Sequence, residues 1–471
     1  MRTSSYIGIA VAAVALAGCT VGPNYKRPQV AVPESFHAPE PLPESQGASL
    51  ADLKWFEVFR DPQLDDLIKV ALVQNYDLRD AVARVDEARA NLGITRSNQY
   101  PQASASGAVE ITHLSRDGQF PLPAFLVPNQ SRNWGQAALN LLSFQLDLWG
   151  QLRRATEASR ANLLSADWNR KTVITTVVSQ VATDYFQLLE LDSELRVSQS
   201  TLENRQKSLK LTLDRQAHGI GTQLDVRQAE QLVAGAAENI PQLQQQIGQT
   251  ENQISLLLGK NPGSIEREGR FNEDYPLPEV PAGLPSALLE RRPDIRAAEQ
   301  SLIAANANIG VARAAYFPQI SLTGSIGGQS STLAKLFSGP NAAWSFVPQV
   351  TQPIFTAGRL KNNVRLAEAQ RQDAQIAYEK LISTAFQEVS DALIAHQRTR
   401  ESRVEQTKLV TALQDRKRLA YRRYEGGVDT QLNALDADRD LLSAQLTLEQ
   451  IRYAELVSTV QLYNALGGGW Q

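Results

Sequence analysis

The chain has 471 residues, and its 47 basic and 50 acidic side chains leave a formal net charge of only −3. This balance produces no field that would collect nucleic acid or acidic ligands, so nucleic-acid binding is not expected. The single cysteine, Cys19, excludes a disulfide within one chain, and the length alone would allow about three average domains.

The N-terminal residues have the features of a secretion signal. Arg2 precedes a short apolar run over residues 7–17 that is too brief to span a bilayer, so residues 1–18 are expected to be removed. Cys19 follows two small residues and is either an incidental thiol or the first residue of the mature chain. The run Leu-Ala-Gly-Cys resembles the lipobox of bacterial lipoproteins, which implies diacylglycerol and N-acyl groups on Cys19. Thr20, where an aspartate would favour the inner membrane, favours the outer membrane.

Residues 19–50 are expected to form an extended, lipidated tether. The stretch from Val21 to Gly47 contains six prolines among polar residues, a composition that favours an extended chain lying along a surface. Two or three acyl chains would anchor such a tether stably in a membrane, where a single chain would not.

The rest of the chain consists of two copies of one module. Residues 77–107 align without a gap with residues 294–324, and twelve of these thirty-one positions are identical. The offset between the copies is 217 here but 208 between Thr222 and Thr430, so the first copy carries nine extra residues in between. The expected division is a first repeat over 51–258, a Pro-rich equatorial connector over 259–285 and a second repeat over 286–471. Such a long period indicates duplication of a large unit around a pseudo-symmetry axis.

Each repeat is expected to contain a long helical hairpin, over about 151–258 and about 359–466. Between Gln151 and Ala217 there is no glycine or proline, and apolar residues recur at a seven-residue spacing that is typical of a coiled coil. This stripe comprises Ile174, Val181, Leu188, Leu195, Leu202 and Leu209. A helix of this length spans about 100 Å, far more than a globular core needs.

The segments of about 101–148 and about 318–356 are expected to form two strands each. After Pro101 and after Pro318, small or apolar residues alternate with polar ones, and a period of two indicates strands. The returning segments are strand-like but less regular, and Pro348 interrupts the second of them. A C-terminal tail follows the second hairpin.

Four strands with one apolar face do not close a membrane barrel. About eight strands are needed, and open sheet edges would leave backbone groups unsatisfied in lipid. Two alternatives remain from this pattern: several chains share one barrel, or two soluble hairpins pack between the helices. No apolar run of eighteen residues follows the signal, so no transmembrane helix is expected.

No residue pattern supports catalysis or a metal site. The four histidines are far apart in the sequence, and there is no nucleophile elbow, phosphate loop or Cys–His pair. The glycines at 467–469 end a helix without a following lysine, so they are interpreted as a helix cap. We expect a protein that is not an enzyme, with no cofactor besides the covalent lipid on Cys19.

Motifs along nearly the whole mature chain resemble those of the outer-membrane efflux factors, the TolC-like channels, in the lipoprotein branch that serves resistance-nodulation-division pumps. The motifs are Leu16-Ala-Gly-Cys19, Trp55-Phe56, Asn75-Tyr-Asp-Leu-Arg79, Arg291-Arg-Pro-Asp-Ile-Arg-Ala-Ala-Glu299, Tyr316-Phe-Pro-Gln-Ile-Ser321, Gln352-Pro-Ile-Phe355 and Leu462-Tyr-Asn-Ala-Leu-Gly-Gly-Gly-Trp470. The arginine-rich motif and the terminal glycine motif, in this order, are the most specific.

This resemblance implies a mainly α-helical protein with a membrane β-barrel. Each chain of a homotrimer would give four strands to a shared 12-stranded barrel and long coiled-coil hairpins to a periplasmic tunnel. The implied location is the outer membrane, and the implied partners are outer-membrane lipid, a periplasmic adaptor and an inner-membrane pump. The implied function is passive conduction of small molecules to the exterior. The alternative is a non-conducting, structural coiled-coil lipoprotein or adhesin.

The resemblance also implies a gate at the periplasmic end of the tunnel, formed by Tyr424, Leu432, Asp436 and Arg439. Leu432 would form an apolar ring and Asp436 an acidic ring. Related channels often have an arginine where this chain has Glu425, so an ion pair to Asp436 at that point is in doubt. From spacing alone, Asp436 and Arg439 are equally an ordinary solvated i, i+3 pair.

The turns of the two hairpins would lie at the periplasmic tip and face the adaptor. The residues concerned are Gly219, Gly221, Thr222, Gly427 and Thr430. The first copy has Leu224, Gln228 and Gln231 at the positions that match the gate, so the charged ring belongs to the second hairpin alone. We expect the second hairpin to be the one that moves.

Overall fold

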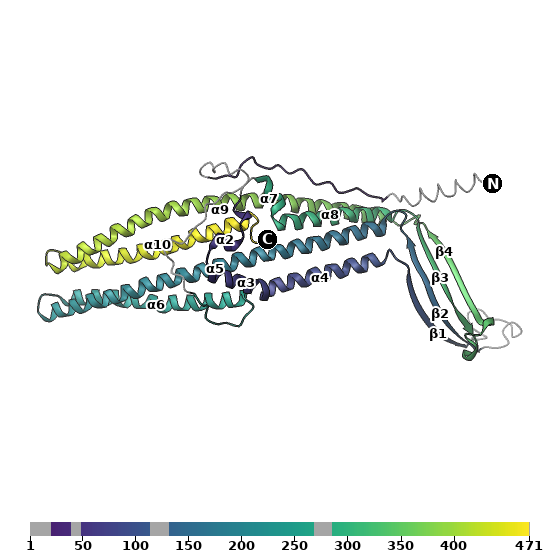
Figure 1. Ribbon diagram of the computed structural model, residues 1–471, viewed down its shortest axis with the longest axis horizontal. Coiled ribbons are helices and arrows are strands. Elements are labelled where there is room, and N and C mark those ends of the chain that lie inside the picture. Colours follow the sequence, from purple (N-terminus) through teal and green to yellow (C-terminus); the bar gives the residue numbers. More distant parts are fainter. Residues whose placement is uncertain (1–19, 39–48, 114–130, 268–284, 471) are drawn as a thin grey trace. The chain divides into compact units, whose positions relative to one another are not determined.

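The computed structural model describes residues 20–38, 49–113, 131–267 and 285–470 (Figure 1). The predicted signal peptide, Cys19, the second half of the tether, the insertion of the first copy and most of the connector lie outside these residues. The chain divides into two compact units. Unit 1 comprises residues 1–29, 85–165 and 298–378, and unit 2 comprises residues 30–84, 166–297 and 379–471.

Most of the described chain is helical. In chain order the helices are η1 (Leu50–Asp52), α2 (Trp55–Phe59), α3 (Pro62–Gln74), α4 (Tyr76–Ser97), α5 (Gln151–Ala217), α6 (Gln223–Leu257), α7 (Pro285–Arg291), α8 (Pro293–Ala314), η2 (Leu333–Lys335), η3 (Gly339–Asn341), α9 (Arg359–Glu425) and α10 (Gln431–Ala465). Within the described residues, none of these helices is both long and apolar enough to cross a membrane.

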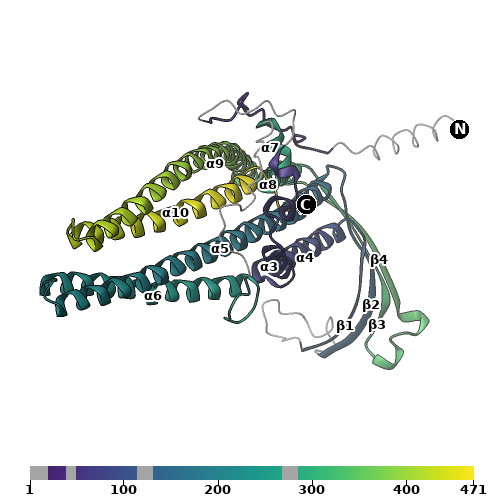
Figure 2. The ribbon, with the colours of Figure 1, turned by 60° about the vertical axis from the view of Figure 1, so that its left-hand side comes forward.

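The two predicted helical hairpins are present and have equal dimensions. Helices α5 and α9 each have 67 residues, and α6 and α10 each have 35. In both views α6 lies beside α5 and α10 lies beside α9 (Figures 1 and 2). The bounds of the two hairpins differ by 208 residues, the offset found between Thr222 and Thr430.

The core of unit 2 gathers around α5. Tyr185 and Phe186 are fully buried, and the ring of Phe59 in α2 lies 5.7 Å from Phe186 and 6.3 Å from Tyr463 in α10. The Tyr185 hydroxyl donates to Asp61, whose carboxylate also caps the first turn of α3. The aromatic residues thus join the short N-terminal helices to both long hairpins.

Unit 1 contains a four-stranded antiparallel sheet in the order β1-β2-β3-β4. The strands are β1 (Gln102–His113), β2 (Ser131–Leu146), β3 (Gln319–Ser330) and β4 (Ala342–Thr351). The β2–β3 register shifts between Asn140 and Leu142. This bulge explains why the alternation of side chains slips there in the sequence. The four strands confirm the predicted content of each chain, and β1 and β4 are the edges.

The register separates an apolar face from a polar face. The apolar face carries Val109, Ile111, Leu139, Phe144, Ile320, Leu322, Trp344 and Phe346. The polar face carries Ser104, Ser106, Asn140, Ser143, Ser321, Thr323, Ser325 and Ser345. The sheet therefore has the two-sided pattern of a barrel wall between lipid and water.

Arg292 of the arginine-rich motif has the same structural role in the second copy as Asn75 has in the first. Asn75 donates to the carbonyl of Leu257 at the end of α6, and Arg292 donates to the carbonyl of Ala465 at the end of α10. The two pairs occupy matching positions in the two copies, so each side chain closes the C-terminus of one hairpin. Gly259 follows α6 with φ of 68°, and a Cβ there would fall on the carbonyl oxygen of Gln74.

Residues 20–29 of the tether pack within unit 1. The Val21 amide donates to the Trp149 carbonyl at 3.0 Å, and the Arg27 guanidinium binds both oxygens of the buried Glu299 at 2.6 Å. Gly22, with φ of 104°, lies so close to Gly310 that a side chain would not fit. Residues 20–38 contain no helix or strand.

Candidate functional site

The first hairpin turns at the predicted tip residues. Gly219 has φ of 75°, and the amides of Ile220 and Gly221 donate to the carbonyl of Arg215, which closes the end of α5. Thr222 then caps α6 and forms a capping box with Asp225.

The second hairpin turns in the same way with different side chains. Gly427 has φ of 70°, and the Val428 amide donates to the carbonyl of Arg423 at 3.1 Å. The Asp429 carboxylate accepts from Asn433, from Arg423 and from the Thr430 amide, and these bonds hold the pKa of Asp429 below its usual value. All five predicted tip residues lie at the two turns. Their contact with an adaptor stays a prediction.

Three of the predicted gate residues lie on the first turns of α10. Leu432 is 52% exposed. The Asp436 carboxylate lies 3.4 Å from the Arg439 guanidinium, which also lies 3.5 Å from Asp440. The Arg439 side chain is largely exposed, so these ion pairs contribute little to stability in a single chain. Arg416 donates to Asp440 and lowers the pKa of that carboxyl. The ring formed by three copies stays a prediction.

Tyr424, the fourth predicted gate residue, lies between the two hairpins. Its ring is only 8% exposed and lies 4.7 Å from the Arg215 guanidinium of α5, which also donates to the Tyr424 carbonyl. This cation–π contact joins the ends of α5 and α9. Within the described part of the chain, Glu425 makes no ion pair.

A buried ion cluster that was not predicted lies next to the gate. The Asp438 carboxylate is 2% exposed and contacts the Arg205 guanidinium at 2.7 Å and the Lys417 ammonium at 2.5 Å. Arg205 also donates to the carbonyl of Leu232. These four residues belong to α10, α5, α9 and α6, so one cluster joins all four helices near the tip.

The ion cluster has no counterpart at the matching positions of the other repeat. Leu413 stands where Arg205 would recur, and Leu209 stands where Lys417 would occur in the first copy. Glu230 matches Asp438 but is only partly buried and pairs with Arg227. The two hairpins are therefore chemically different at this level.

A sequence signal for this cluster exists beside the leucine stripe. Three residues after each stripe position, α5 carries a second row that is also buried but largely polar. The row comprises Val177, Asp184, Leu191, Ser198, Arg205 and Thr212. Leu202 and Leu209 of the leucine stripe are only half-buried. Polar residues at seven-residue spacing inside a coiled coil mark positions where partner and register are specified.

Buried carboxyls continue this polar seam toward the middle of α5. Burial, then the nearby carboxylates of Glu194 and Glu449, raise the pKa of Glu190 to about 8. Glu194 accepts from Gln450 of α10 at 3.0 Å. Burial also raises the pKa of Asp184 to about 6, although Gln180 and Gln253 donate to it. This interface therefore favours protonated carboxyls.

Stability should fall as pH rises through this range. Because folding raises the pKa of Glu190 from 4.5 to about 8, its ionisation increasingly opposes folding as pH rises from about 4.5 to 8. Glu190→Gln should raise the thermal midpoint at pH 8 by a few degrees, at about 2–4 °C per kcal/mol, and flatten its pH dependence. Circular dichroism of the variant, with the exposed Glu203→Gln as a control, tests this. An unchanged pH dependence in Glu190→Gln would contradict the assignment.

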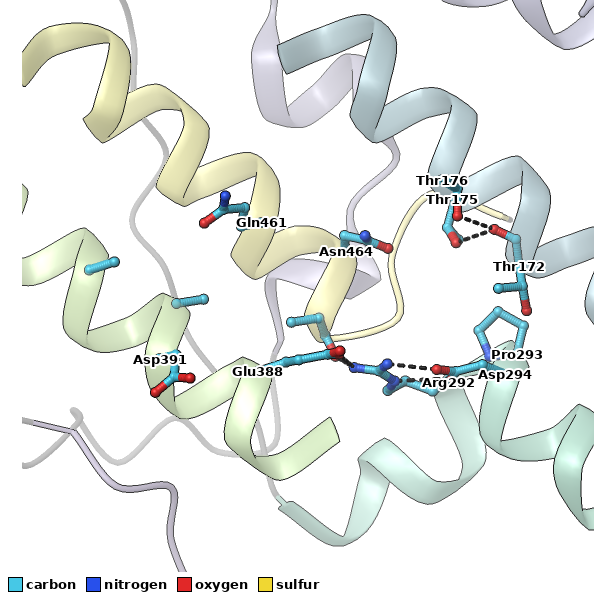
Figure 3. Close-up of a pocket in the computed structure, with 13 residues that line it drawn as sticks. Thr172, Thr175, Thr176, Arg292, Pro293, Asp294, Glu388, Asp391, Gln461 and Asn464 are labelled. Carbon is cyan, nitrogen blue, oxygen red and sulfur yellow. Dashed lines mark hydrogen bonds and ion pairs between the residues drawn. The ribbon is translucent and has the colours of Figure 1, made fainter. Parts of the chain in front are cut away.

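A pocket of about 500 Å³ lies beside the arginine-rich motif in unit 2. Figure 3 shows Arg292 between Asp294 and Glu388, and Arg292 donates to each of them at 2.6 Å. Thr172, Thr175 and Thr176 of α5 and Gln461 and Asn464 of α10 are among the other residues that line it. Arg292 is thus neutralised by its neighbours and serves to join α9, α10 and the start of α8. Across the described residues, no group of three His, Cys, Asp or Glu side chains is placed to hold a metal ion.

Comparisons with known proteins agree with this architecture. The model of the family described as outer membrane efflux protein matches residues 67–260 and 284–468. The probable efflux pump outer membrane protein TtgC of Pseudomonas putida is 38% identical over 99% of this chain and 96% of its own length. The cation efflux system protein CusC of Escherichia coli is 36% identical over 98% of this chain and 97% of its own length. A crystal structure of CusC matches with a TM-score of 0.86 at 35% identity, covering 96% of this chain and 100% of that one.

Proposed function

Because the chain belongs to the outer membrane efflux protein family, we propose that it is the outer-membrane channel of a tripartite efflux system and passively conducts small molecules to the exterior. The observation that carries this proposal is the sheet, which has one apolar face, one polar face and, among the residues that the structure describes, two edges without a neighbouring strand. Such a sheet is stable in lipid only if further strands close it.

We propose that three copies supply these strands. Three chains with four strands each give a 12-stranded barrel, and an even number of antiparallel strands is the rule for bacterial outer-membrane barrels. The hairpins of three chains would then form the periplasmic tunnel. Acylation of Cys19, which lies outside the described residues, would add an anchor in the outer membrane, and the ordered contacts of Val21 to Arg27 begin two residues later.

The partners proposed for this channel are a periplasmic adaptor and an inner-membrane pump. The name of the Pseudomonas putida relative describes it as the outer membrane protein of an efflux pump, which supports a role for this chain in such an assembly. The two hairpin turns would face the adaptor, because they expose Ile220 and Val428 at 70% and 67%.

We propose that Leu432 and Asp436 form the gate. A narrow apolar constriction excludes water and ions, which is the role given to three copies of Leu432. Three Asp436 carboxylates on one axis repel one another unless cations offset the repulsion, so this ring would attract multivalent cations. In each chain, the weakly held Arg439 is the nearest cation to Asp436.

Recordings from planar bilayers test this gate. Leu432→Ala should raise the resting conductance, because it widens the apolar constriction. Asp436→Ala should alter cation preference and weaken block by multivalent cations added from the periplasmic side. Leu224→Ala, at the matching position of the first hairpin, is the control and should leave resting conductance unchanged. Unchanged conductance in Leu432→Ala with undiminished block in Asp436→Ala would place the gate elsewhere.

A further inference from the structure

Strands β1 and β4, at the two edges of the sheet, indicate how one copy of the chain would join the next. Within the described residues, strands β1 and β4 each have one neighbouring strand, and the two strands are 12 and 10 residues long. Unpaired edges of this length demand a partner strand.

The internal duplication indicates which residues of the two edge strands would pair between neighbouring copies. Strands β1 and β3 match at an offset of 217, so Gly107 corresponds to Gly324. Gly107 pairs with Ala137 in β2, and Gly324 pairs with Phe346 in β4, so Ala137 corresponds to Phe346. The contact between β2 and β3 is therefore the template for a contact between β4 and β1 of a neighbouring copy.

We infer that β4 of one chain pairs antiparallel with β1 of a second copy in one register, with Phe346 opposite Ile111 of the neighbouring copy. The step follows because Ala137 pairs with Gly328, and Gly328 corresponds to Ile111. The same mapping places Ser345 opposite Thr112 and Trp344 opposite His113 of the neighbouring copy. This inference rests on the proposed shared barrel and specifies its seam.

The chemistry of the two faces supports this register. Phe346 lies on the apolar face of the chain, as does Ile111, and Ser345 lies on the polar face, as does Thr112. A slip of one residue would bring apolar side chains to the polar face, so it is excluded by the pattern. A slip of two residues preserves the faces, and only the duplication argues against it.

Cysteine pairs separate these registers. Directly paired residues of antiparallel strands have Cα atoms about 4.5–5.5 Å apart, which suits a disulfide, whereas diagonal neighbours lie about 7–8 Å apart. In the full-length chain with Cys19 retained, Ser345→Cys with Thr112→Cys should give a covalent trimer under mild oxidation. The band should run at three times the mass of one chain on a non-reducing denaturing gel. Ser345→Cys with Glu110→Cys, shifted by two residues on the same face, should remain monomeric.

A positive control exists within the chain. The hydroxyl oxygens of Ser325 and Ser345 lie 2.8 Å apart, so Ser325→Cys with Ser345→Cys should form a disulfide without adding a second chain. A covalent trimer from the shifted pair instead of the matched pair would overturn the register while leaving a shared barrel. A native trimer that neither pair links would place another contact at the seam. A protein that is monomeric in its native state, and that still conducts with a raised resting conductance in Leu432→Ala, would overturn the seam but leave the channel function.

Discussion

Replacing Asp438 with alanine should destabilise the tip of the helical hairpins by about 3–5 kcal/mol, because the change leaves the buried Arg205 and the partly buried Lys417 without their counter-ion. Asp438 is 2% exposed, and Arg205 and Lys417 both contact its carboxylate. Urea unfolding followed by circular dichroism would measure the loss. Asp440→Ala removes an exposed carboxylate two residues away and should cost about 0–1 kcal/mol.

A second variant separates the charge from the packing. Leucine at positions 205, 417 and 438 together removes the whole ion cluster and gives two of the positions the residue found in the other repeat. Well-packed apolar residues often replace a buried ion cluster at little cost, so this variant should be close to wild type in stability. If Asp438→Ala alone is as stable as Asp440→Ala, the cluster does not hold the hairpins together.

Arginine at Leu322 should cost about 2–4 kcal/mol if the apolar face of the sheet meets lipid near the bilayer midplane. Leu322 is flanked by Phe144 and Pro348 on this face. Arginine at the adjacent Thr323, on the polar face, should be tolerated, because its side chain would enter water. Heat-resistant trimer on a gel is the measurement.

The adjacent pair makes the result interpretable. Both substitutions introduce the same side chain into the same strand, so loss of trimer in Leu322→Arg alone reports the environment of the face. Ile320→Arg and Ser321→Arg repeat the comparison one pair further along β3. Equal tolerance at both faces would contradict the assignment of β3 to a membrane barrel.

The features that occur in both repeats were predictable from the sequence, because each of them appears in two matching segments. The two hairpins, the four strands and the turns at Gly219 and Gly427 all follow from matching segments and from local rules of periodicity and helix ends. The lengths of the hairpins could be predicted from the distances between breaks in the helical pattern alone.

Features that occur once were not predictable in the same way. Arg205 appears in the sequence as one of many charged residues on a coiled coil, and only the arrangement of four helices shows that it is buried against Asp438. Tyr424 is similar, because its contact with Arg215 depends on how the two hairpins meet. The largely polar row on α5 did mark an interface in the sequence, because a seven-residue period indicates contact with partner helices whatever the chemistry of its residues.

Single-channel recording of the purified, full-length protein in planar bilayers tests the channel function most directly. The account predicts uniform conductance steps, with a larger resting conductance in Leu432→Ala than in wild type. A protein that forms heat-resistant trimers and inserts into the bilayer, yet gives no steps in wild type or in Leu432→Ala, would contradict it and favour a structural coiled-coil lipoprotein.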